Sequence, residues 1–159
     1  MYDLLIQRGE VLDPGAGLHG LLDVAINRNR IVAVERGIPA EAAFRVVDAR
    51  GLLVMPALID LHTHIYHHVT YWGIDPAPVA ARSGVGTWLD AGSAGAYTFA
   101  GLREFVTRQS ALRLYALLNI SAIGLVGITG ELANLDYCDI ALCERIINLN
   151  RDLIVGVKA

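Results

Sequence analysis

The stretch PALIDLHTH, residues 56–64, decides how this chain folds, because an apolar run leads directly into two histidines separated by one residue. Side chains alternate between the two faces of a β-strand, so His62 and His64 are predicted to point the same way, with Asp60 on that face. Two imidazoles at the end of a strand can bind one divalent metal ion. The alternative is a pair of hydrogen-bonded core histidines. Asp60 is expected to support the ligands or the backbone rather than to be a ligand itself.

The composition excludes several classes of protein. The chain has 159 residues, a formal net charge of -3 and 54% hydrophobic residues, which is enough for a sizeable core and gives no reason to expect a nucleic-acid partner. The longest apolar stretch is shorter than the roughly 20 residues of a membrane span, and the N-terminus carries no secretory signal. The two cysteines, Cys138 and Cys143, match neither a zinc nor a redox motif, so we expect free thiols in a cytoplasmic protein.

Residues 1–55 are predicted to form a small antiparallel β segment. Short runs with strand character are separated by glycine and proline, and Gly9 with Glu10 is expected to form a turn. The polar residues 27–29 lie between two such runs and predict a hairpin. The expected strands are residues 2–8, 11–14, 23–26, 30–34, 45–48 and 52–55.

Residues 56–159 are predicted to alternate between strands and helices, which is typical of a parallel sheet with right-handed crossovers. A closed eight-stranded barrel needs about 250 residues, so the fold class is α/β and this segment corresponds to four β/α units, half of a (β/α)8 TIM barrel. The expected strands are residues 58–63, 85–90, 112–120 and 153–157, and the expected helices are residues 77–82, 99–109 and 139–150.

Polar residues follow each of the four predicted strands, and the carboxyl ends of parallel strands meet at one edge of a sheet. After the histidine pair come Asp90 with the turn 92–95, then Asn119 with Ser121, and finally Lys158. The turn, which contains Ser93 and Gly95, could present N–H groups to a substrate carboxylate or could be a plain tight turn.

His67 and His68 lie in the loop that follows the histidine pair. Loops over the mouth of a barrel carry specificity, so these histidines are candidates for substrate contact. A solvated loop with no such role is the alternative.

Three further stretches carry a family resemblance together with residues 59–64. These are residues 86–95, residues 131–139 and the sequence GVK at 156–158. Together they resemble the amidohydrolase superfamily, in the branch of deacetylases related to dihydroorotase. The resemblance covers essentially the whole chain but only the N-terminal half of such an enzyme, and it implies that residues 1–55 belong to a composite β-sandwich domain and residues 56–159 to strands one to four of the barrel.

The resemblance implies a hydrolase that acts on an amide or ester bond of a small molecule through a metal-activated hydroxide. His62 and His64 would bind the more buried of two zinc ions, and Lys158, carboxylated by CO2, would bridge both; other divalent metals accept the same ligands. The family takes two more histidines and a catalytic aspartate from later strands, which lie beyond residue 159. This chain is therefore expected to contain metal ligands but no catalytic residue.

Two other interpretations remain open. The chain could be a truncated or split, non-catalytic fragment that associates with copies of itself or with a missing C-terminal half. It could also be a relative that has lost catalysis, although the presence of His62, His64 and Lys158 argues against that.

Overall fold

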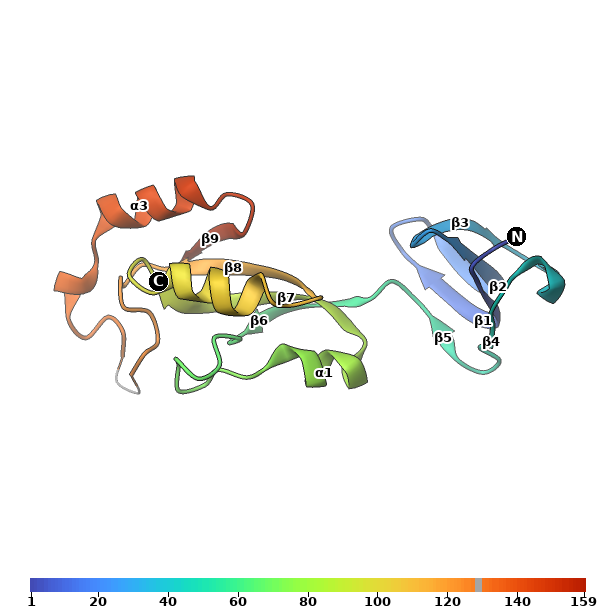
Figure 1. Cartoon of the computed structure of the whole chain (residues 1–159), viewed down its shortest axis with the longest axis horizontal. Coiled ribbons are helices and arrows are strands. Elements are labelled where there is room, and N and C mark those ends of the chain that lie inside the picture. The colour runs from blue at the N-terminus through green and yellow to red at the C-terminus, as the bar shows by residue number, and fades with distance from the viewer. Residues whose placement is uncertain (128–129) are drawn as a thin grey trace. The chain divides into compact units, whose positions relative to one another are not determined.

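The computed structural model describes residues 1–127 and 130–159, and it divides into two compact units, Met1–Pro56 and Ala57–Ala159 (Figure 1). Within the described ranges, no helix combines the length and the apolar character needed to cross a bilayer. Each unit has its own sheet. The elements of the first unit are β1 (Leu4–Asp13), β2 (Leu18–Asn27), β3 (Arg30–Glu35), η1 (Ala40–Ala42), β4 (Val46–Asp48) and β5 (Leu53–Val54).

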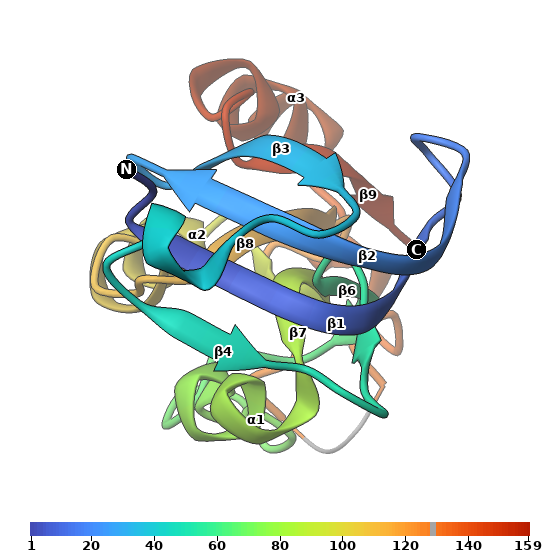
Figure 2. The same ribbon diagram turned by 90° about the vertical axis from the view of Figure 1, so that its right-hand side faces the viewer.

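The sheet of the first unit has the order β3-β2-β1-β4, and β5 also pairs with β1 (Figure 2). The hairpin between β2 and β3 is confirmed: its two turn residues, Arg28 and Asn29, have φ angles of 50° and 61°, as a tight primed turn requires. The expectation of a wholly antiparallel sheet is wrong in one respect, because β4 and β5 both run parallel to β1. The first unit is therefore an antiparallel sheet of three strands with two short parallel strands added.

The predicted turn at Gly9 and Glu10 is also wrong, because β1 runs straight through both residues. An irregularity between Ile6 and Gly9 absorbs the change in register, with Arg8 in the left-handed region at a φ of 63°. A β-carbon on Gly9 would overlap the side chain of Val54 in β5. The glycine thus serves close strand packing rather than a turn.

The second unit contains a parallel sheet of order β6-β7-β8-β9, as the alternation of strands and helices predicts. Two expectations differ in detail. The second strand continues five residues past Asp90 to Gly95, and the helix at residues 99–109 is a short α-helix followed by a π-helix. The elements are β6 (Leu58–Thr63), α1 (Pro76–Ser83), β7 (Val85–Gly95), α2 (Phe99–Gly101), the π-helix η2 (Leu102–Thr107), β8 (Arg113–Asn119), η3 (Leu135–Tyr137), α3 (Ile140–Leu149) and β9 (Ile154–Lys158).

The core of the second unit lies on the face of the sheet that the helices cover. Alternate residues of β8, such as Leu118, pack there with side chains of α2, η2 and α3. The residues between them, such as Leu117, are only half-buried. Apolar side chains on the two edge strands are exposed, and these include Ile59 and Leu61 in β6 and Val155 in β9.

Each pair of neighbouring strands in this sheet contains a register shift. The shifts include one between Asp60 and Thr63 in β6, one between Ala91 and Gly95 in β7, and one at Val155 in β9, where Ala116 pairs with Ile154 but Leu117 pairs with Gly156. Such bulges re-aim side chains near functional sites.

Candidate metal centre

The structure brings His62 and His64 together at the carboxyl end of β6. Their ring centroids lie 5.6 Å apart with the rings at 79° to each other. His62 is exposed and His64 is half-buried. The Asp60 carboxylate accepts a hydrogen bond from the amide of His62 at 3.1 Å, so it is bound to the local backbone.

His64 is tied to the neighbouring strand through Ser93. Its Nδ1 lies 3.1 Å from Ser93 Oγ. Asp90, which is completely buried like Ser93, accepts the amides of Ile65 at 2.9 Å and of Ser93 at 2.6 Å. Asp90 therefore joins the segment that carries His64 to the end of β7.

The electrostatics of this region favour a neutral imidazole at His64. Burial lowers its pKa below the ordinary value of 6.5, and Asp90 opposes this effect, while the charges of His62 and Lys158 lower the pKa further. Glu131, in the loop after β8, opposes it as well. Neutral imidazole is the form of histidine that binds metals. Burial also raises the pKa of Asp90, against the effect of its hydrogen bonds from Ile65 and Ser93.

Lys158 lies at the end of β9, directly opposite Asn119 in the register of the sheet. Its aliphatic carbons Cγ and Cβ lie 2.5 and 2.6 Å from the point where a side chain on Gly92 would begin. Asn119 is buried, and its side chain donates to the Gly92 carbonyl at 3.0 Å and accepts from the Ser121 amide at 2.9 Å. Lys158 is the single lysine of the chain.

The remaining predicted residues lie apart from this cluster or already have partners in the protein. His67 has its Nδ1 3.3 Å from the Ile65 carbonyl and lines a hollow of about 250 Å³ between the start of α1 and η2. His68 is exposed, with a φ angle of 64°. The amide of Gly95 donates to Thr98 Oγ1 at 3.1 Å, and that of Ser93 donates to Asp90, so both amides have acceptors within the protein.

Sequence reasoning assigned no role to Trp72, which the structure places near His64, or to Glu131, whose charge opposes the lowering of the His64 pKa. The ring of Trp72 lies 6.5 Å from that of His64, and Tyr71 packs edge-on against Trp72 at 5.3 Å. Both aromatic side chains are largely exposed, at 47% for Trp72 and 71% for Tyr71. Two adjacent aromatics in a loop were the only available signal in the sequence.

The donor set fits part of a metal centre. His62 and His64 offer two adjacent imidazoles, and Lys158 becomes an anionic donor once it is carboxylated. Among residues 1–127 and 130–159, no group of three or more His, Cys, Asp and Glu side chains gathers in a way that could hold a metal ion. The described residues alone therefore supply an incomplete coordination sphere.

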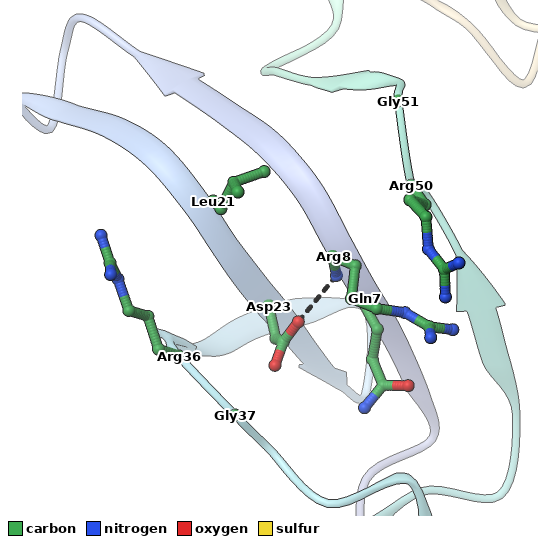
Figure 3. Close-up of a pocket in the computed structure, with 8 residues that line it drawn as sticks. All are labelled: Gln7, Arg8, Leu21, Asp23, Arg36, Gly37, Arg50 and Gly51. Carbon is green, nitrogen blue, oxygen red and sulfur yellow. Dashed lines mark hydrogen bonds between the residues drawn. The ribbon is translucent and has the colours of Figure 1, made fainter.

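A separate hollow of about 620 Å³ lies in the first unit, and none of the predicted site residues lines it (Figure 3). Three arginines surround it, and the buried Asp23 accepts the amides of Arg8 at 2.8 Å and Ile38 at 2.9 Å. Arg8 is already paired with Asp48 at 2.9 Å. Asp23 therefore holds the local backbone together, and the arginines beside it lie at the surface of the hollow.

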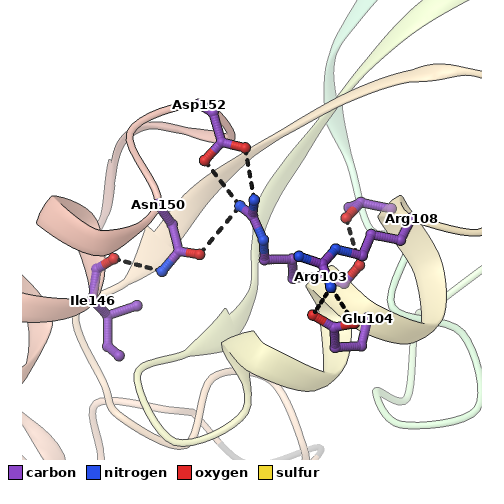
Figure 4. Close-up of polar contacts among 7 residues, drawn as sticks. Arg103, Glu104, Arg108, Ile146, Asn150 and Asp152 are labelled. Atoms are coloured by element: carbon purple, nitrogen blue, oxygen red, sulfur yellow. Dashed lines mark hydrogen bonds and ion pairs between the residues drawn. The ribbon is translucent and has the colours of Figure 1, made fainter.

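A polar network ties η2 to the turn before β9, at the end of the sheet opposite the histidines (Figure 4). The Arg103 guanidinium donates two hydrogen bonds to the Asp152 carboxylate, at 2.9 and 2.8 Å, and one to the Asn150 side chain at 3.2 Å. Hydrogen bonding to Arg103 lowers the pKa of Asp152. Features at the amino ends of strands in such folds serve stability.

Comparison with known proteins shows which family this chain resembles. No family model matches the chain, but it is 39% identical over 132 residues to a deacetylase of Agrobacterium fabrum, a match that covers 81% of this chain and 32% of the deacetylase. The crystal structure of a dihydroorotase superposes with a TM-score of 0.88 at 32% identity, over 99% of this chain and 42% of that one. The crystal structure of an adenine deaminase superposes with a TM-score of 0.82 at 29% identity, and this match covers 100% of this chain and 41% of the deaminase.

The chain belongs to the amidohydrolase superfamily, in its deacetylase-like and dihydroorotase-like branch, and it corresponds to the N-terminal portion of those chains. It spans about a third of the length of the deacetylase it matches.

Proposed function

We propose that this chain supplies the first part of the metal centre of a hydrolase that acts on an amide or ester bond of a small molecule, as a deacetylase does. The observation that carries the proposal is the convergence of His62, His64 and Lys158 at the carboxyl ends of parallel strands. The family relatives named deacetylase and dihydroorotase support the same class of substrate.

In this proposal His62, His64 and a carboxylated Lys158 hold zinc or another divalent metal. The bound metal would polarise the scissile carbonyl and lower the pKa of a water nucleophile. The chain's own residues prepare the ligands: burial lowers the pKa of His64 and so favours its neutral form, and Ser93 Oγ lies within hydrogen-bond distance of its Nδ1. Carboxylation joins the neutral Lys158 amine to CO2 by a new N–C bond, releases one proton to solvent and leaves an anionic carbamate.

We further propose that the sheet β6-β7-β8-β9 forms strands one to four of a (β/α)8 barrel and that the first unit belongs to a composite β domain. The exposed apolar side chains on β6 and β9 support this, because further strands paired there would cover them. The catalytic proton shuttle would then come from that later part of the fold.

The experiment compares wild type with His62→Ala and with His19→Ala as a matched control, since His19 is an exposed histidine on β2 of the first unit. Zinc content after dialysis and hydrolysis of N-acetylated amino acids are measured, with the rest of the barrel supplied as a second polypeptide. Wild type and His19→Ala should retain zinc and activity, and His62→Ala should lose both. Full zinc retention and turnover in His62→Ala would refute the proposal.

A second candidate is a non-catalytic chain that associates through its open edges. Ile59 at 62% exposure and Leu61 at 69% on the edge strand β6 favour it, because unpaired strand edges recruit other strands. Stoichiometric zinc together with turnover by the purified chain would exclude this candidate. A metal-free, inert and self-associating chain would exclude activity by these residues alone.

A further inference from the structure

We propose that residues 90–93 of strand β7 position two metal ligands at once: Ser93 occupies one ring nitrogen of His64 and leaves the other to face the metal, and Gly92 leaves room for the side chain of Lys158. The identity of the ligands rests on the proposed function. The positioning itself rests on contacts within the second unit. Partners of this kind fix the orientation of ligating side chains in metal sites.

The first step concerns the partners of the His64 ring. Both oxygens of Asp90 accept backbone amides, from Ile65 and Ser93, so Asp90 fixes the backbone next to His64 and at Ser93. Ser93 Oγ lies 3.1 Å from Nδ1 of His64, so this nitrogen already has a partner within the protein. Nε2 of His64 is therefore the nitrogen left to face a cation.

The second step concerns the space around Lys158. Gly92 has a φ angle of 87°, a left-handed conformation that side chains disfavour, and the Lys158 stem lies over its α-carbon. The Asn119 side chain holds the Gly92 carbonyl at 3.0 Å, and Asn119 is the register partner of Lys158. Any side chain at Gly92 would push Lys158 away from this path.

The serine is tested by Ser93→Ala, with Ser121→Ala as the matched control. Both serines are fully buried at the same edge of the sheet, but Ser121 Oγ has no hydrogen-bond partner among the described residues. Long-range 1H–15N spectra of the metal-free chain at about pH 8, where histidine is neutral, report the tautomer of His64. We expect a single His64 tautomer in wild type and Ser121→Ala, and a mixture in Ser93→Ala, because only the Ser93 hydroxyl contacts Nδ1. Zinc affinity should fall about 10- to 100-fold in Ser93→Ala alone.

The glycine is tested by Gly92→Ala, with Gly84→Ala as the matched control. Gly84 has a similar φ angle, 72°, but a β-carbon there meets nothing within 4 Å, so this variant carries the backbone strain alone. Because Lys158 is the single lysine, 13C-lysine labelling yields one side-chain signal set. Gly92→Ala should shift these signals and weaken zinc binding beyond any effect of Gly84→Ala.

The outcomes separate this inference from the proposed function. A wild type that binds no zinc but loses its single His64 tautomer in Ser93→Ala would overturn the metal centre and leave the positioning role intact. A wild type that binds zinc, with the His64 tautomer unchanged in Ser93→Ala and the Lys158 signals unchanged in Gly92→Ala, would overturn the positioning role and leave the metal centre intact.

Discussion

The loop that carries His64 is anchored to α2 by Tyr66, and a double-mutant cycle with Gly101 measures that anchor. Tyr66 is buried, and its hydroxyl donates to the Thr98 carbonyl at 3.1 Å. The hydroxyl also occupies the space where a side chain on Gly101 would begin. The perturbation is Gly101→Ala, whose backbone angles of -67° and -43° suit alanine.

The structure gives the size of the effect. Overpacking against the Tyr66 hydroxyl should cost about 1–3 kcal/mol, and loss of its hydrogen bond about 1 kcal/mol more. Alanine has a higher helix propensity than glycine, which offsets about 1 kcal/mol of this cost, so the net destabilisation is about 1–3 kcal/mol. In a Tyr66→Phe background the nearest atoms are the ring Cζ at 3.4 Å and Phe105 Cδ2 at 3.9 Å, which are ordinary contacts. There Gly101→Ala should be neutral or stabilising by up to about 1 kcal/mol.

Urea unfolding followed by tryptophan fluorescence measures the cycle, because both tryptophans, Trp72 and Trp88, lie in the second unit and Trp88 is buried. The expected coupling between Gly101 and Tyr66 is about 1–4 kcal/mol, with the double variant more stable than the sum of the single variants predicts. Equal destabilisation by Gly101→Ala in the wild-type and Tyr66→Phe backgrounds would refute this reasoning.

Four other predictions concern stability. Arg103→Lys should lower the thermal midpoint of the second unit, because lysine cannot form the two parallel hydrogen bonds that Arg103 donates to Asp152. The loss should be larger at low salt than at high salt, because salt screens exposed ion pairs. Since Arg103 lowers the pKa of Asp152, the pair stabilises the fold above the carboxyl's ordinary value of 3.8, and wild type and Asp152→Asn should converge as the pH falls below it. Leu118→Ala should cost about 2–5 kcal/mol in urea unfolding and Leu117→Ala, half-buried on the other face, clearly less; equal costs would contradict the assignment of the core. Arg28→Asn should stabilise the first unit by up to about 1 kcal/mol in thermal melts followed by circular dichroism, since asparagine tolerates the φ angle of 50° there.

Local patterns in the sequence were sufficient for the sheet of the second unit and for the histidine pair. Apolar runs and helical periodicity depend on neighbouring residues, so the four parallel strands could be predicted. The adjacency of His62 and His64 follows from alternation along a single strand.

Long-range choices could not be read from the sequence. The parallel direction of β4 and β5 depends on β1, some 40 residues earlier in the chain. The hydrogen bond between His64 and Ser93 joins residues 29 positions apart. Gly9 resembles a turn residue because glycine has the same sequence signature in a turn and at a close approach of two strands.

The bulge at Val155 determines which way Lys158 faces. Strand side chains repeat every two residues, so Ile154 and Lys158 would share a face of an unbroken β9. The extra residue between the pairs Ala116–Ile154 and Leu117–Gly156 reverses that parity, so Ile154 is buried in the core under the helices while Lys158 pairs with Asn119 in the opposite row. The length of this strand is consequently constrained as well as its composition: the loss of one residue near Val155 would turn Lys158 toward the face that the helices cover, although Lys158 itself would be unchanged.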